Sequence, residues 1–451
     1  MADTIYALST PPGVGALAIV RVSGPRALAA LEQLSGQKNF APRMATRVRL
    51  SFNGAVLDDG IAVYFAAPHS FTGEDIVEFT LHGGRAVTQG VLSVLSKIKS
   101  LHLAEPGEFT RRAFENGKLD LTQAEAIADL IHAETTMQRA QALSQLSGSL
   151  SDLYHGWAAR LTTLLAHAEA DIDFPDEDLP DGLIATLCPK IETLIDEFEK
   201  HLSDNRRGER LRDGITVAIL GAPNAGKSTL LNALAQRDVA IVTDIAGTTR
   251  DVLEVHLDLG GYPITLLDTA GLRETENIVE AEGIRRARER AAGADLKLCL
   301  FDSGTEPDVA TRAMVDENTM IIFTKIDAAS HDSRQGPEFA NTNLAGSYNL
   351  FLSAQTGEGI PELLIAITAR LENIFAAPRE APSLTRTRHR EALQESLAAL
   401  QRAVFNPSGA ALPELFAEDL RLALRSLGRI TGRVDVEDLL DKIFKDFCLG
   451  K

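Results

Sequence analysis

The sequence predicts a chain with an α+β domain first, then an α-helical domain, and an α/β domain inserted within the helical one. Its 451 residues are too many for a single hydrophobic core and suggest about three domains. Short strand-like runs fill the start of the chain, helical periodicity begins near Leu119 and returns after Arg386, and strand and helix patterns alternate in between. We therefore place the domains at 1–118, at 119–212 together with 377–451, and at 213–376.

The bulk composition is that of a globular protein with aliphatic cores. Hydrophobic residues make up 45%, charged residues 24% and aromatic residues 5% of the chain, and the low aromatic share favours helix-rich packing. The formal charge of −18 argues against a broad basic surface for nucleic acid, since phosphate binding needs a local excess of Lys and Arg. Any contact with RNA is expected to be local or to come from a partner.

The cysteines and the chain start indicate a cytoplasmic protein. Cys188, Cys299 and Cys448 lie far apart and have no metal-ligand spacing, which fits a reducing compartment. No basic region followed by an apolar run opens the chain, and no apolar stretch approaches the roughly 18 residues that a membrane span needs. We therefore expect no membrane segment.

The first domain carries polar residues within its expected strands. Strands are predicted over 16–22, 62–65 and 75–79, and a helix over 85–99. Arg21 and Glu78 lie inside two of these strands. A strand residue that alternates outward is usually only solvated, so spacing alone does not decide between solvation and function.

The helical domain is predicted from periodicity over 121–132, 143–167, 184–204, 386–405 and 412–432. The acidic, proline-containing run 171–180 ends one helix. Because it has no glycine-centred calcium loop, a solvated turn is favoured over a divalent-metal site. Residues 206–212 are read as a connector, and Cys448 is by its spacing an incidental exposed thiol.

The inserted domain begins with a phosphate-binding loop. A β-branched apolar run from Ile215 ends at Gly221, the loop Gly221-Ala-Pro-Asn-Ala-Gly-Lys-Ser follows, and a helical pattern begins at Ser228. Backbone N–H groups of such a loop cradle phosphates, while Lys227 reaches the β- and γ-phosphates and the Ser228 hydroxyl ligates Mg²⁺.

Further motifs complete a guanine-nucleotide site. The strand run 264–267 ends in Asp268-Thr-Ala-Gly, suited to Mg²⁺ and γ-phosphate sensing, and strands are also expected at 296–301 and 320–323. Thr324-Lys-Ile-Asp327 follows the last of these, and Asp327 can accept the two N–H groups of guanine. Ser353 and Ala354 supply a further base-contacting loop. These motifs, each at the end of a strand, predict a GTP-binding P-loop domain.

The water-activating group of this site is not obvious. Leu272 follows Gly271 where Ras-like GTPases have a glutamine. Asn224 and the carbonyls of segment 243–251 could cage a monovalent cation that replaces an arginine finger. The alternative is that Asn224 only shapes the loop.

Motifs along the whole chain resemble the MnmE (TrmE) family of bacterial GTPases that modify the wobble uridine of certain tRNAs. They are the GTPase motifs together with Thr10-Pro-Pro-Gly-Val-Gly-Ala, Ser70-Phe-Thr-Gly-Glu-Asp, His82-Gly-Gly, Pro106-Gly-Glu-Phe-Thr-Arg-Arg-Ala-Phe, Gly117-Lys-Leu-Asp-Leu-Thr-Gln-Ala-Glu-Ala-Ile, Ile245-Ala-Gly-Thr-Thr-Arg-Asp and the terminal Cys448-Leu-Gly-Lys. The GTPase motifs are widely shared, whereas the N-terminal set and the terminus are specific.

For the N-terminal domain, the resemblance implies a tetrahydrofolate-binding-like fold that dimerises and holds a 5-formyltetrahydrofolate-type donor. Arg21, Glu78, Lys118 and Lys451 fall on its folate contacts, and Cys448 on a terminal cysteine near the folate. A C-terminal helix would have to fold back to bring that end there.

For the GTPase domain, the resemblance implies activation by K⁺ and dimerisation across the switch regions. Asn224, Thr243, Ile245 and Thr248 match the K⁺ ligands, and Ser228 and Thr249 the Mg²⁺ ligands. Glu280 matches a glutamate that orients the attacking water, and the expected catalytic residues are therefore Glu280, Lys227 and Asp268. Thr324 departs from the family's base-binding motif, where Asn is usual. The expected nucleotide contacts are Asn224, Ala225, Gly226, Lys227, Ser228, Thr229, Thr243, Asp244, Ile245, Ala246, Gly247, Thr248, Thr249, Asp268, Thr269, Ala270, Gly271, Thr324, Lys325, Asp327, Ser353 and Ala354.

The resemblance also implies a partner. The FAD- and NADH-using protein MnmG (GidA) would join a homodimer of this chain in a heterotetramer or larger assembly and help it to serve tRNA. Together they would install aminomethyl or carboxymethylaminomethyl groups on C5 of uridine 34. The competing hypothesis is a regulatory or ribosome-associated GTPase in which 1–118 is only a dimerisation scaffold.

Overall fold

The fold divides into two compact units. The computed structural model describes residues 3–173, 183–237, 239–240, 254–268, 293–328, 349–375, 382–405, 413–434, 437–445, 447 and 450. By its contacts, unit 1 consists of Met1–Ala128, Gln145–Phe198 and Glu391–Lys451, and unit 2 of Asp129–Ser144 and Glu199–Arg390. The boundaries that we place at 118, 212 and 376 remain a prediction.

Unit 1 begins with a six-stranded sheet in the order β3-β4-β5-β2-β1-β6. The described pairs are antiparallel except β1 with β6. Apolar residues alternate along the strands, and one face buries them under two helices. The elements are β1 (Thr4–Leu8), β2 (Leu17–Ser23), α1 (Ala27–Ser35), β3 (Thr46–Phe52), β4 (Ala55–Phe65), β5 (Ile76–His82), α2 (Arg85–Leu95) and β6 (Leu101–Leu103).

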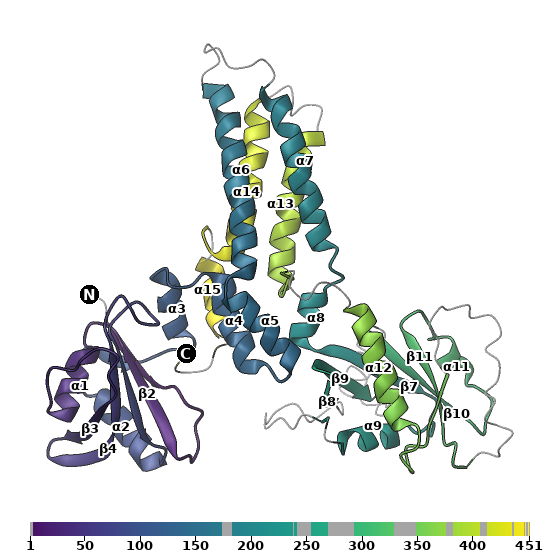
Figure 1. Cartoon of the computed structure of the whole chain (residues 1–451), viewed down its shortest axis with the longest axis horizontal. Coiled ribbons are helices and arrows are strands. Elements are labelled where there is room, and N and C mark those ends of the chain that lie inside the picture. The colour runs from purple at the N-terminus through teal and green to yellow at the C-terminus, as the bar shows by residue number, and fades with distance from the viewer. Residues whose placement is uncertain are drawn as a thin grey trace, which may run out of the picture. The chain divides into compact units, whose positions relative to one another are not determined.

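Helices complete unit 1, and α6 (Ser149–Asp173), α7 (Leu183–Leu202), α13 (Thr387–Phe405) and α14 (Pro413–Thr431) run alongside one another (Figure 1). Polar contacts join them: Trp157 Nε1 of α6 donates to Glu197 of α7 at 2.7 Å, and Ser396 Oγ of α13 donates to the Ala423 carbonyl of α14 at 2.9 Å. Among the described residues, no helix is both long and apolar enough to cross a bilayer. The helices are α3 (Glu108–Glu115), α4 (Leu121–His132), α6 (Ser149–Asp173), α7 (Leu183–Leu202), α13 (Thr387–Phe405), α14 (Pro413–Thr431) and α15 (Glu437–Lys445).

Unit 2 is built on a second sheet, ordered β12-β11-β10-β7-β9-β8. Its described pairs are parallel except β8 with β9. Strands such as β11 are buried along their whole length, as expected of a parallel sheet covered on both faces. The elements are β7 (Ile215–Gly221), α9 (Lys227–Ala235), β8 (Glu254–Leu259), β9 (Tyr262–Asp268), β10 (Leu296–Asp302), α11 (Val309–Arg312), β11 (Thr319–Thr324), β12 (Asn349–Phe351) and α12 (Ile360–Ile374).

Two further helices attach to this second sheet. In α5 (Thr136–Leu146), the Met137 amide donates to the Gly261 carbonyl in the β8–β9 turn at 3.3 Å, and Met137 packs against the core of the sheet. Gln138 Nε2 donates at 3.0 Å to the carbonyl of Arg212 in α8 (Arg207–Asp213). The start of α5 therefore belongs with the α/β sheet, although its sequence lies within the predicted helical domain.

Several expected elements differ from the observed ones. The helix expected over 85–99 ends at Leu95, because the chain turns so that Ile98 enters the core before β6. The helix expected over 143–167 is two helices, since Gly148 at φ 99° breaks the pattern. The connector expected at 206–212 is helix α8, and the strand expected at 62–65 is the end of the longer β4.

Candidate functional site

The phosphate loop joins β7 to α9 as the sequence predicts. Gly226 precedes the helix at φ 93°, and Asn224 has φ 66°, so both occupy the left-handed region that glycine and asparagine tolerate. Lys227 Nζ donates to the carbonyls of Gly221 at 2.7 Å and Ala222 at 2.9 Å. The ammonium group therefore lies over its own loop, where a lysine can neutralise phosphate charge.

Thr324, which departs from the usual asparagine, supports this loop from below. Its hydroxyl donates to the carbonyl of Ala225 at 2.7 Å, and the residue is only 2% exposed. A Cβ on Gly226 would lie 3.8 Å from the Thr324 side chain. Thr324 thus ties the end of β11 to the phosphate loop by a buried hydrogen bond.

The expected base-binding loops meet at the same edge of the sheet. Lys325 has φ 60°, and its Nζ lies 2.7 Å from Asp302 Oδ2 at the end of β10. Burial raises the pKa of Asp302, but hydrogen bonds from Lys325 and the Gly304 amide outweigh it and lower the pKa below its usual value. Asp302 therefore stays ionised, and its ion pair holds the Lys325 side chain next to the loop that contains Asp327.

Asp327 and Ser353, both expected to contact the base, lie on two loops that a main-chain hydrogen bond joins. The Asp327 side chain is exposed, whereas Ser353 is buried and its Oγ accepts the Thr356 amide at 3.2 Å. The Ile326 amide donates to the Leu352 carbonyl at 3.5 Å, which holds the two loops together. Ala354 is half-buried beside them.

Part of the expected nucleotide site lies outside the described residues. Ser228 and Thr229 are exposed at the start of α9, and the main chain of Asp268 ends β9 opposite Ile219 of β7. Among the described residues, no group of three or more His, Cys, Asp or Glu side chains is placed to hold a metal ion. The expected residues outside the described ranges are Thr243, Asp244, Ile245, Ala246, Gly247, Thr248, Thr249, Thr269, Ala270, Gly271, Glu280, Cys448 and Lys451, and so is most of the acidic run 171–180.

In unit 1, the strand residues Arg21 and Glu78 are direct partners across β2 and β5. Arg21 Nη2 lies 2.7 Å from Glu78 Oε1, and the two side chains are 21% and 27% exposed. The guanidinium carbon lies 5.7 Å from the centre of the Phe71 ring and 5.6 Å from that of Phe109. The Arg21 guanidinium is thus paired with a carboxylate, lies beside two aromatic rings and remains partly accessible to solvent.

The C-terminal chain reaches this pair. The Gly450 carbonyl accepts a hydrogen bond from Ser9 Oγ at 3.0 Å and lies 3.5 Å from Arg21 Nη1. Lys118 is exposed, and its Nζ donates to the Pro68 carbonyl at 3.0 Å, on the loop that also carries Phe71. The structure therefore brings Arg21, Glu78 and the terminal main chain together, while Lys118 contacts the neighbouring loop.

Sequence reasoning missed several of these neighbours. Phe71 and Phe109 lie in the motifs Ser70-Phe-Thr-Gly-Glu-Asp and Pro106-Gly-Glu-Phe, whose specificity was a usable signal. Asp302 directly follows an expected strand, which is where ligand-site residues of such sheets lie. Ser9 gave no signal of its own.

Comparisons with known proteins agree along the whole chain. The model of the MnmE helical domain matches residues 121–448, and the model named GTP-binding protein TrmE N-terminus matches residues 4–118. The tRNA modification GTPase MnmE of Parvibaculum lavamentivorans is 54% identical over 451 residues, covering 100% of both chains. That of Paramagnetospirillum magneticum is 53% identical over 454 residues, again covering 100% of both.

A solved G domain, that of the FeoB iron transporter of T. maritima, also matches. It is 27% identical, and the match covers 35% of this chain and 98% of that one at a TM-score of 0.26.

Proposed function

The chain belongs to the MnmE family of tRNA modification GTPases, and from this premise we propose that it drives the C5 modification of wobble uridine 34 with a reduced-folate one-carbon donor. It is a GTP hydrolase that takes part in tRNA modification. The proposal adds the modified position, the aminomethyl or carboxymethylaminomethyl product, and the donor.

The observation that carries the folate proposal is the Arg21–Glu78 pair with the Gly450 carbonyl beside it. A pterin offers an amide-like edge that a carboxylate such as Glu78 can bind, and its glutamate tail suits cationic groups. On this proposal Arg21, Glu78, Lys118 and Lys451 hold a 5-formyltetrahydrofolate-type donor, which supplies the carbon that is transferred. Phe71, which is partly exposed beside Arg21, would contact the ring system, while the buried Phe109 supports the guanidinium from within the fold.

For GTP hydrolysis, we assign the chain's residues as follows. Lys227 neutralises phosphate charge, Ser228 and Thr249 supply hydroxyl ligands for Mg²⁺, and Asp268 accepts hydrogen bonds from its water shell. Asn224 with the carbonyls of Thr243, Ile245 and Thr248 would hold K⁺, which supplies positive charge beside the phosphates. Glu280 would orient the attacking water, and Asp327 selects guanine.

The assembly that we propose is a homodimer that works in the cytoplasm with the FAD-dependent protein MnmG. An acidic chain with a net charge of −18 can serve tRNA if a partner supplies the basic surface. Pairing of two GTPase domains across their switch regions would close the cation site.

Calorimetric titration with 5-formyltetrahydrofolate tests the donor site. Arg21→Ala and Glu78→Ala should each weaken binding at least about tenfold, the effect of losing a hydrogen bond to a charged group. The matched control is Arg47→Ala, since Arg47 also pairs with a carboxylate across two strands, Asp59 at 2.9 Å, but is 82% exposed. Equal affinity in all three variants would refute the site and favour the regulatory GTPase with a scaffold domain.

A cation substitution tests the hydrolysis proposal. At equal ionic strength, GTP turnover should be faster in KCl than in NaCl, because the cage is matched to K⁺. Asn224→Ala should remove that difference. Equal turnover in both salts by the unmodified protein contradicts K⁺ activation and leaves Asn224 as a loop-shaping residue.

A further inference from the structure

Helix α15 packs closely against the start of α3. Gly107 precedes α3 at φ 70°, and a Cβ at this position would lie 2.6 Å from the Phe444 carbonyl oxygen and 2.9 Å from the Phe444 Cβ. A glycine is therefore required here twice over, by the left-handed backbone and by the approach of α15. The two segments lie more than three hundred residues apart in the sequence.

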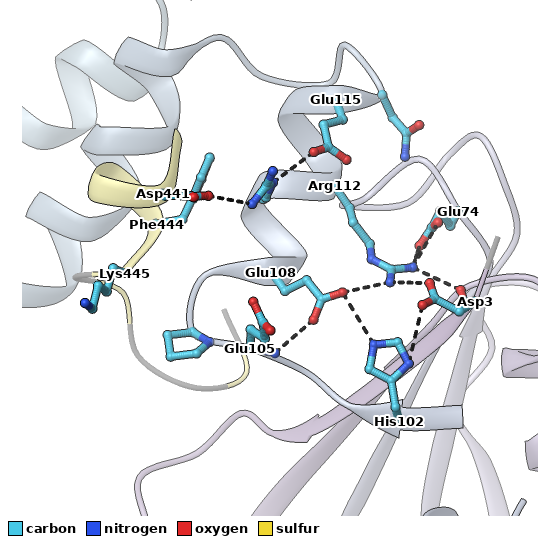
Figure 2. A pocket seen from close by; sticks show the side chains of 13 residues that line it. Asp3, Glu74, His102, Glu105, Glu108, Arg112, Glu115, Asp441, Phe444 and Lys445 are labelled. Atoms are coloured by element: carbon cyan, nitrogen blue, oxygen red, sulfur yellow. Dashed lines mark hydrogen bonds and ion pairs between the residues drawn. The ribbon is translucent and has the colours of Figure 1, made fainter. Parts of the chain in front are cut away.

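The contact between α15 and α3 is stabilised by apolar packing of Phe444 and by an ion pair. The Phe444 ring is 3% exposed in an apolar cluster with Leu121 and Phe447, and the Phe444 and Phe447 rings lie 5.5 Å apart. Arg111 Nη1 of α3 lies 3.1 Å from Asp441 Oδ1 of α15. Figure 2 shows Asp441, Phe444 and Lys445 of α15 beside α3, and all three line a pocket of about 810 Å³ together with residues of α3.

Helix α3 is in turn fixed to the sheet that carries Arg21. Its Arg112 is 12% exposed and pairs with Asp3 at 2.8 Å, Glu108 at 2.8 Å and Glu74 at 3.3 Å. Figure 2 shows this network on the side of α3 away from Asp441. Phe109 of the same helix is fully buried beside the Arg21 guanidinium. Helix α3 thus links α15 on one side to Arg21 on the other.

Gly450, which follows α15 in the sequence, lies at the Arg21 pair. Gly450 has φ 89°, and a Cβ there would lie 2.4 Å from the Leu8 carbonyl oxygen. Its carbonyl accepts from Ser9 and approaches Arg21. From Phe444 to Gly450 the chain spans at most about 20 Å when extended, so where α15 docks limits where the terminus can reach.

We propose that Gly107 and Phe444 are positioning residues for the Arg21–Glu78 site: by seating α15 on α3 they hold the Gly450 carbonyl at Arg21. The inference rests on the proposed folate function for its ligand but not for its geometry. When α15 is docked on α3, the residues that follow it are held close to Arg21. The effective concentration of the Gly450 carbonyl at the site is therefore higher than it would be with an undocked helix. The Arg21 side chain makes its hydrogen bonds to Glu78 and to the Gly450 carbonyl, so Gly107 and Phe444 act through the docked helix.

The test compares Gly107→Ala with Gly36→Ala. Both glycines are left-handed next to a helix, at φ 70° and 69°, but a Cβ at Gly36 has nothing within 4 Å. The free-energy cost of placing alanine in a left-handed backbone conformation is therefore similar in the two variants. Only in Gly107→Ala does the new Cβ also clash with α15 and displace that helix. We expect Gly107→Ala to weaken binding of 5-formyltetrahydrofolate by about tenfold and Gly36→Ala to leave it unchanged.

Alkylation of Cys448 gives a readout that needs no folate. The alkylation rate is measured by mass spectrometry of the C-terminal peptide. We expect a higher rate in Gly107→Ala than in the unmodified protein and in Gly36→Ala. Equal rates in all three overturn the proposal. If the unmodified protein does not bind the folate but the rate difference appears, the proposed donor is wrong while the positioning stands.

A truncation separates positioning from general destabilisation. In a chain lacking Gly450 and Lys451, Gly107→Ala should have no further effect on folate affinity, because the group that it positions is already gone. A loss as large as in the full chain would overturn the proposal. Should Gly107→Ala fail to fold, Phe444→Leu, which keeps most of the apolar volume, should give the same pattern with a smaller loss.

Discussion

Removing the Thr324 hydroxyl should weaken nucleotide binding through the phosphate loop. Thr324→Val keeps the branched shape but leaves the Ala225 carbonyl, which accepts from Thr324 Oγ1 at 2.7 Å, without its partner. A buried acceptor that loses its hydrogen bond costs about 1–3 kcal/mol, and every 1.4 kcal/mol is about tenfold in affinity. We therefore expect the Kd for GDP to rise between about fivefold and a hundredfold.

The matched control is Thr324→Ser, which keeps the hydroxyl and removes only the methyl group. Titration with a fluorescent GDP analogue should place its Kd close to that of the unmodified protein. Thermal unfolding of both variants checks that the GTPase fold is intact. A Thr324→Val protein that binds within about twofold of the unmodified one, or a Thr324→Ser protein that is equally weak, would refute the role of this hydroxyl.

Further predictions concern GTP hydrolysis and the stability of the folded chain. Glu280→Ala should slow GTP hydrolysis while leaving GTP affinity nearly unchanged, and a large loss of binding would contradict a purely catalytic role. Arg390→Ala should lower the unfolding free energy by about 3–5 kcal/mol, because it removes the cation paired with the buried Asp204 and leaves the buried Glu209 with Arg206 as its remaining ion partner. The control Arg402→Ala, whose pair with Asp419 is half exposed, should cost about 1 kcal/mol or less in urea titrations. Burial, with some help from Arg390 and against the opposing effect of Asp204, lowers the pKa of His201 to about 4 from 6.5. Because the unfolded chain then binds more protons than the folded one between these values, stability should fall as the pH drops from 6.5 to 4, and His201→Gln should flatten that slope.

Much of the GTPase architecture could be predicted because its signals are local. Strand β7 ends at Gly221 and α9 begins at Lys227, within a residue of the expected positions, since a buried parallel strand reads as a continuous apolar run. The predicted helix boundaries were wrong where the backbone conformation of one or two residues interrupted the hydrophobic periodicity. Gly148 splits one expected helix into α5 and α6, and the left-handed Asn205 and Arg206 start α8 where a connector was expected.

The assembly of the N-terminal site could be predicted only in part. The resemblance to the MnmE family predicted Arg21 and Glu78 as folate contacts, and the pairing register of β2 with β5 makes the two residues neighbours. Gly107 lies in the specific motif Pro106-Gly-Glu-Phe, but its contact with Phe444 could not be predicted, because the left-handed backbone already accounts for a glycine there without the approach of α15. Likewise, nothing in the periodicity of 136–146 indicates that Met137 packs against the core of the α/β sheet.

The most direct test of the proposed role is mass spectrometry of wobble nucleosides in total tRNA from a strain that lacks this protein. C5-aminomethyl-type uridines should be absent, and should return when the intact gene is supplied but not when it carries Asp268→Ala. That result would place GTP hydrolysis within the modification pathway. An unchanged nucleoside profile in the deletion strain would contradict the proposal and leave a regulatory GTPase whose N-terminal domain is a scaffold.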